Sequence, residues 1–304
     1  MSIAISLPSG VTAKITSLEV WMNEVVKRAE NLRPAWDSDD VHDVRVALRR
    51  CRTMADTLAD VNPGPGWHKL KRHSKKLFRA LGDLHDTQVE RAWLRKLSSM
   101  KENGGGVRKH MLRVLARREK NSRTAAEDAL DAFDRKAWRK LTRKLPDEAS
   151  FFPMESVVFQ REALAKLNQA VELYQKARKN ASSLAWHRTR IGIKRFRYVV
   201  ENFLPQRYEP WSADLKRMQD LLGDVHDLDV LGADIKKEVD KLAPVEVAAW
   251  LETIAAERKI RLDQFRAMAS AKNSPWLVWR AAFRWGHSLI PAAEHPRSQA
   301  FYAS

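Results

Sequence analysis

The stretch that decides the fold runs from Val41 to Leu58 and reads VHDVRVALRRCRTMADTL. On a helix, at about 100° per residue, one face carries a histidine and three arginines: His42, Arg45, Arg49 and Arg52. The opposite face is apolar and includes Val44 and Leu48. Like charges at this spacing repel one another. The stripe therefore indicates a site for an anionic ligand on an amphipathic helix whose other side packs against a core.

The same pattern occurs a second time, 145 residues later, in HRTRIGIKRFRYVV from His187 to Val200. The basic residues that correspond are His42, Arg45, Arg49, Arg50 and Arg52 in the first copy and His187, Arg190, Lys194, Arg195 and Arg197 in the second. A later phrase also repeats, as LGDLHD at 81–86 and LGDVHD at 222–227. Two motifs in the same order indicate an internal duplication. The sequence predicts an all-α chain of two pseudo-symmetric helical bundles packed into one compact unit.

Composition and charge describe a folded protein with a polyanionic partner. The 304 residues carry 55 Lys and Arg against 38 Asp and Glu, a net charge of +17. This implies nucleic acid, an anionic membrane surface or a phosphate-rich molecule as the partner. The single cysteine, Cys51, excludes an intramolecular disulfide. Neither a signal peptide nor a run of about 18 apolar residues is found, so a cytoplasmic protein with no membrane segment is expected.

Prolines, glycines and capping residues predict where the helices end. Gly82 is expected to close one helix in a left-handed cap, and Asp83 to cap the next. Pro146 is expected to end a helical segment that starts near Val107. In the second copy the expected helices cover about 156–179, 183–203, 212–222 and 224–242, with two more after Pro244 and Pro275. The predicted boundaries are a leader at 1–14, a first repeat at 15–150, a second repeat at 151–290 and a C-terminal tail at 291–304.

The repeated basic residues are suited to phosphate. Arginine presents a planar fork of donors that matches phosphate oxygens, lysine adds a mobile charge, and histidine titrates near neutrality. Most charge runs only solvate an exposed face, but recurrence on the same face of both copies favours a binding function. The pairs His42-Asp43, His85-Asp86 and His226-Asp227 leave a metal-dependent phosphohydrolase open as an alternative. No Walker A sequence, zinc signature or nucleophile elbow occurs, so no cofactor, metal ligand or catalytic residue is predicted.

At these residues the sequence resembles the CHAD family of histidine-containing α-helical proteins. The features that match are His-x-x-Arg-x-x-x-Arg/Lys-Arg-x-Arg at 42–52 and 187–197, and Leu-Gly-Asp-x-His-Asp at 81–86 and 222–227. The match covers about residues 15–289. The resemblance implies paired helical bundles that bind inorganic polyphosphate along a basic surface or central groove, and a stand-alone member that is not an enzyme. It also implies a location at polyphosphate granules.

The resemblance carries over to a set of phosphate-binding residues in both copies. The full predicted set is His42, Arg45, Arg49, Arg50, Arg52, Lys75, Lys76, Arg79, His187, Arg190, Lys194, Arg195, Arg197, Lys216 and Arg217. Arg79 corresponds to Asp220 in the second copy, so the two halves are not expected to contribute equally. Weak non-specific nucleic-acid binding stays open as an alternative, because any protein of this charge attracts nucleic acid. The oligomeric state and the roles of His85 and His226 are left open.

Overall fold

The computed structural model describes residues 16–32, 36–98 and 105–284, and these fold into helices with no strand among them. The first half contains α1 (Thr16–Asn31), α2 (Ser38–Val61), α3 (Pro65–Ser98), α4 (Gly105–Asp131) and α5 (Arg135–Ala149). The second contains α6 (Val157–Lys179), α7 (Ser183–Phe203), α8 (Pro205–Lys237), the short 3-10 helix η1 (Val239–Lys241), α9 (Pro244–Ser270) and α10 (Pro275–Arg284). The predicted all-α class is confirmed.

The two motif helices begin at side-chain caps that the sequence supplies. The Asp37 carboxylate accepts hydrogen bonds from the backbone amides of Asp39 and Asp40 at 2.9 Å each, and so starts α2. The Ser182 hydroxyl accepts the amide of Ala185 at the start of α7. Each helix then buries its apolar face, including Leu48 and Cys51 in α2. The cationic stripes consequently face away from the core.

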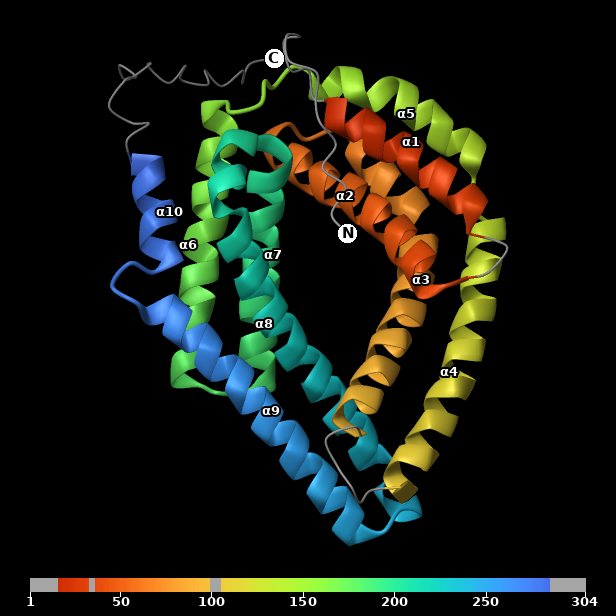
Figure 1. Cartoon of the computed structure of the whole chain (residues 1–304). Coiled ribbons are helices and arrows are strands. Elements are labelled where there is room, and N and C mark those ends of the chain that lie inside the picture. The colour runs from red at the N-terminus through yellow and green to blue at the C-terminus, as the bar shows by residue number, and fades with distance from the viewer. Residues whose placement is uncertain (1–15, 33–35, 99–104, 285–304) are drawn as a thin grey trace, which may run out of the picture.

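The expected breaks at the Gly-Asp phrases are wrong. Gly82 lies inside the continuous helix α3, and Gly223 lies inside the equally unbroken α8. Neither glycine ends a helix, because each following segment continues the same apolar periodicity into further packing. Pro146 also lies inside a helix, α5, rather than after one. α3 and α8 are therefore long, continuous helices that run toward the end of the molecule opposite α1 and α5 (Figure 1).

The two halves meet through corresponding helices. α2 packs against α7, α3 against α8, and α4 against α9. Within each half consecutive α-helices also pack together, except that α5 packs mainly against α1 and α3 rather than against α4. Figure 1 shows α3 and α4 descending on one side and α8 and α9 on the other, and the two pairs converge at the end opposite α1 and α5. The structure thus places the two motif helices face to face. The duplication itself stays a prediction, as do the repeat boundaries.

Apolar side chains form two separate cores along this framework. The larger core contains the buried apolar side chains of α1, α2, α6 and α7 and extends to Leu84 on α3 and Val225 on α8. The smaller core begins at Trp93 on α3 and Leu228 on α8 and joins these helices to α4 and α9. Between the two cores, α3 and α8 present Asp86, Glu90, His226 and Asp227, together with Val89 and Val230, to a shared cavity. This polar layer is where the candidate site lies.

Some sequence predictions fall outside the described residues. The leader at 1–14 and the tail at 291–304 belong to this group, as do residues 285–290 of the predicted second repeat. Among the helices that are described, none combines the length with the apolar character that crossing a bilayer requires.

Candidate functional site

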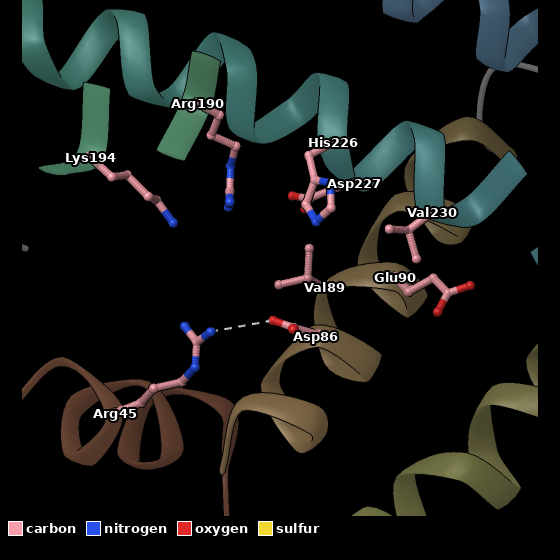
Figure 2. Close-up of a pocket in the computed structure, with 9 residues that line it drawn as sticks. All are labelled: Arg45, Asp86, Val89, Glu90, Arg190, Lys194, His226, Asp227 and Val230. Atoms are coloured by element: carbon pink, nitrogen blue, oxygen red, sulfur yellow. Dashed lines mark ion pairs between the residues drawn. The ribbon is translucent and has the colours of Figure 1, made fainter. Parts of the chain in front are cut away.

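The polar layer encloses a cavity of about 160 Å³ between the two halves. Since one water molecule occupies about 30 Å³ in the liquid, the cavity has room for a small polar ligand. Figure 2 shows Arg45 entering from one side and Arg190 and Lys194 from the other, with Asp86 and Asp227 nearby. An adjoining space of about 240 Å³ shares these residues and adds His42, Arg49 and His85. We call the two spaces together the central cavity.

The first half contributes Arg45 and Arg49 to the central cavity from consecutive turns of α2. The Arg45 guanidinium lies over the ring of Phe78, 5.8 Å from its centroid, and forms an ion pair with Asp86 at 3.6 Å. Gly82 faces Arg45 at the point where α3 passes α2, and a Cβ there would lie 3.6 Å from the Arg45 Nε. Arg49 lies over the ring of Tyr198, which belongs to the second half. Both arginines are thus held in place by aromatic rings at the cavity wall.

The second half contributes Arg190 and Lys194 from α7, one turn apart. Burial lowers the pKa of Lys194 to about 7, and repulsion from Arg190, Arg49 and Arg45 adds to the effect. Burial also lowers the pKa of Arg190. Figure 2 shows both side chains directed toward Arg45. Helical spacing explains why they converge, because positions i and i+4 lie on one face.

The four cavity cations are poorly neutralised by the protein. Within the described part of the chain, Arg49, Arg190 and Lys194 form no ion pair, and Arg45 has only the long contact to Asp86. The Nε atoms of Arg45 and Arg190 are buried without a hydrogen-bond partner among the described residues. Half-buried cations that repel one another raise the free energy of the empty site. An anion placed among them would relieve this repulsion and accept the free donors.

A pair of histidines lies at each side of the cavity, formed by one residue from each repeated motif. His42 Nδ1 lies 3.3 Å from His85 Nε2, and His187 Nδ1 lies 3.2 Å from His226 Nδ1. Burial lowers the pKa of His226 to about 4, with further repulsion from Arg190 and His187. Partial desolvation, then neighbouring charges, also lowers the pKa of His42 and of His187. The lowered pKa values favour the neutral forms of His42, His187 and His226 near neutral pH, and the ring nitrogens of each pair lie within hydrogen-bonding distance.

Five carboxylates that were not predicted as ligand-binding residues also line the central cavity, namely Asp86, Glu90, Asp220, Asp224 and Asp227. Two of them, Asp86 and Asp227, are the last residues of the repeated LGDxHD phrases. Burial raises the pKa of Asp227 to about 6, although Arg190 opposes this shift. Partial desolvation opposes ionisation of Asp86, but a hydrogen bond with His85 and the charges of Arg45 and Arg190 outweigh it and hold its pKa below the usual value. The two residues occupy equivalent places in the repeated LGDxHD phrases. That repetition was the signal that could have identified them.

Other members of the predicted set serve as structural links instead. Arg50 donates to Asn202 Oδ1 at 3.1 Å and pairs with Glu201, which joins α2 to α7. Arg52 donates to the carbonyl of Lys71 and the hydroxyl of Ser74, which joins α2 to α3. Arg197 pairs with Glu201 and donates to Gln219 at 3.2 Å. The structure does not bring these three arginines to the central cavity.

The remaining predicted residues lie at the surface. Lys75, Lys76 and Arg79 line a separate groove between α3 and α4. In the second half Lys216 pairs with Asp220, and Arg217 donates to Gln264 at 3.2 Å. Arg195 is exposed. Whether any of these binds phosphate stays a prediction, but they do not share the central cavity with Arg45 and Lys194.

Tyr198, which contacts Arg49 from the opposite half, was not among the predicted site residues. No periodicity could have found it, because it depends on how α7 lies against α2. For the metal alternative, the described residues contain no group of three His, Cys, Asp or Glu side chains placed to hold a metal ion. The His-Asp pairs instead meet arginines and a lysine. The arrangement is suited to holding an anion by several charge-assisted contacts.

Comparison with known proteins agrees with this fold. A family model described as CHAD domain matches residues 19–236. The crystal structure of the CHAD domain from the plant Ricinus communis superposes with a TM-score of 0.58 at 20% identity, covering 94% of this chain and 96% of that one. PptA from Streptomyces chartreusis superposes with a TM-score of 0.63 at 14% identity, covering 83% and 96% of the two chains. No curated protein shows significant sequence similarity to the chain.

Proposed function

This chain belongs to the CHAD domain family, and on that premise we propose that its central cavity binds inorganic polyphosphate without catalysing a reaction. The observation that carries the proposal is the meeting of Arg45 and Arg49 with Arg190 and Lys194 around one cavity. Each half supplies two cations, so successive phosphates of one polymer can contact both halves at once. Through such binding the protein would be directed to polyphosphate granules.

Polyphosphate suits this cavity because every phosphate along the polymer carries charge. A small anion could relieve the repulsion at only one or two of the four cations. A polymer can enter as one ligand with several contacts, which raises affinity through effective concentration. Release of counterions should make the binding strongly dependent on salt. The +17 net charge adds long-range attraction but gives no selectivity by itself.

The direct test removes the four cavity cations together. The variant combines Arg45→Ala, Arg49→Ala, Arg190→Ala and Lys194→Ala. We expect its affinity for long-chain polyphosphate to fall by about 100-fold or more, since charge-assisted hydrogen bonds contribute about 1.5–3 kcal/mol each. Isothermal titration calorimetry measures the affinity, and circular dichroism shows whether the helices remain. Unchanged binding by a folded quadruple variant would refute the proposal.

A matched control separates the cavity from net charge. Replacing Lys136, Lys140 and Arg143 of α5 together with Lys109 of α4 by alanine removes the same amount of charge from exposed positions. This control should keep its affinity within about threefold, a change of about 0.65 kcal/mol on the scale of 1.4 kcal/mol per factor of ten. Equal losses in the control and the cavity variant would mean that charge acts generically.

Competition decides between polyphosphate and the nucleic-acid alternative. We expect duplex DNA at equal phosphate concentration and about 150 mM salt to displace polyphosphate poorly, because a duplex is too wide to enter either space of the central cavity, of about 160 Å³ and about 240 Å³. Efficient displacement would favour the nucleic-acid reading. Release of orthophosphate with Mg²⁺ or Mn²⁺, lost in Asp86→Asn or Asp227→Asn, would instead favour the phosphohydrolase reading.

A further inference from the structure

A second basic feature lies outside the central cavity, in the groove between α3 and α4. The groove has a volume of about 430 Å³, and its charged lining consists of Arg72, Lys75, Lys76, Arg79 and Asp83. The apolar lining consists of three alanines, Ala80 on α3 and Ala125 and Ala129 on α4. The groove shares no lining residue with the central cavity. We call it the outer groove.

The cations of the outer groove have no partner among the described residues. All four side chains are exposed, and none of them forms a hydrogen bond or ion pair with another described residue. Exposed cations elsewhere are often paired, as Lys216 is with Asp220 and Lys259 is with Asp263. Four cations against one carboxylate leave the groove strongly positive. Its charge is complementary to an acidic surface.

The corresponding region of the second half is closed by polar bridges. Lys76 corresponds to Arg217, which donates to Gln264 of α9 at 3.2 Å. Asp83 corresponds to Asp224, which pairs with Arg261 of α9 at 3.3 Å. In the first half α4 presents alanines at the groove, so no polar side chain reaches across from it. Among the described residues, these two bridges have no counterpart in the lining of the outer groove.

We propose that the outer groove docks an acidic amphipathic helix of a partner protein. Small residues let a third helix approach two packed helices closely, as ridges fit into grooves. An apolar strip along the docked helix would cover the alanines, and carboxylates beside the strip would pair with Lys75, Lys76 and Arg79. Bare polyphosphate would fit less well, because the alanine side chains offer it no donor. The proposal goes beyond polyphosphate binding and gives the protein a second, separate contact.

The test uses a peptide probe with the intact chain. The probe is a labelled helical peptide of about 20 residues, long enough to form helix in isolation, with Glu on one face and Ala and Leu on the other. Fluorescence anisotropy should show binding to the full chain and no binding of a second peptide in which Gln replaces every Glu. The variant Lys75→Glu with Arg79→Glu should weaken binding at least about tenfold, or 1.4 kcal/mol. Circular dichroism checks that it folds.

A matched variant controls for the change in net charge. Lys136→Glu with Lys140→Glu reverses two exposed charges at the same spacing on α5 and should leave peptide binding unchanged. Absence of peptide binding to the wild-type chain, or equal loss in both variants, would overturn the proposal. A loss of polyphosphate affinity clearly larger in the Lys75→Glu, Arg79→Glu variant than in the Lys136→Glu, Lys140→Glu control would also overturn it, because the groove would then be part of the polyphosphate path. Since the peptide assay contains no polyphosphate, its outcome is independent of the function proposed for the central cavity.

Discussion

Lys194 is the cavity residue whose charge depends most directly on pH near neutrality. In the free protein its pKa is about 7, because burial and three arginines disfavour its charged form. A bound polyanion would favour the charged form and raise this pKa. Binding is therefore linked to proton uptake above pH 7. Below pH 7 the side chain is already charged, so this contribution to affinity is fully present there.

We predict that affinity for polyphosphate falls as pH rises from 7 to 9, by up to about tenfold per unit, or 1.36 kcal/mol. The variant Lys194→Arg keeps its charge over this range and should flatten the profile. Calorimetric titration at several pH values, in buffers of different ionisation enthalpy, measures both affinity and proton uptake. Asp227, with a pKa of about 6, should contribute a decline of the same sign at lower pH. A variant profile as steep as that of wild type would contradict the role assigned to Lys194.

At the scale of the element, α3 and α8 show why a glycine inside a long helix can mislead. Gly82 lies where α3 passes the Arg45 side chain, whereas an added Cβ at Gly223 would have no neighbour within 4 Å. Glycine at Gly223 therefore serves neither a turn nor a close contact. Gly192 differs, because an added Cβ would lie 3.1 Å from the backbone Cα of Ala170 on α6. That glycine allows α6 and α7 to pack closely.

These environments predict opposite effects of alanine. Gly223→Ala should stabilise the protein by about 0.5–1 kcal/mol, the usual helix preference of alanine over glycine. Gly192→Ala should destabilise it, because α6 and α7 would have to separate slightly. Urea unfolding followed by circular dichroism measures both. A destabilised Gly223→Ala variant would contradict the open environment assigned to Gly223.

The extent to which sequence could predict the site differs from residue to residue. Helical spacing placed Arg45, Arg49, Arg190 and Lys194 on shared stripes, and the structure brings these four residues together. Arg50 belongs to the same motif but is held by Asn202, which is 152 residues distant in the chain. Periodicity assigns a residue to a face of its own helix. It does not show which helix from the other half covers that face.

At the scale of the whole molecule, one cluster joins the two pairs of long helices beside the cavity. Arg118 of α4 pairs with Glu90 of α3 at 2.8 Å and with Asp234 of α8 at 2.6 Å. Burial, and then the charge of Asp234, raises the pKa of Glu90 to about 7. Asp234 stays ionised, because contacts with Lys237 and Arg118 outweigh its desolvation and lower its pKa. The positive charge of Arg118 thus offsets the repulsion between the carboxyl groups of Glu90 and Asp234.

We predict that Arg118→Met destabilises the protein at neutral pH by about 2 kcal/mol, less than the loss of a fully buried partner would cost, because Arg118 is partly exposed. The defect should shrink at pH 5, since protonation of Glu90 removes the repulsion that Arg118 otherwise offsets. Denaturant unfolding of both proteins at the two pH values tests this. Arg139→Met, which disrupts only an exposed pair with Glu30, serves as the control and should change stability little.

The division of the apolar interior into two cores has a consequence for how the molecule opens. The smaller core at the converging ends of α3, α4, α8 and α9 is separated from the larger one by the charged layer. The two can act as distinct cooperative units, each with its own free energy of local unfolding. Amide hydrogens in the smaller unit should then exchange with solvent before those of α2 and α7. A polymer bound in the layer between them would couple the two units and slow exchange at an end of the protein that it does not touch.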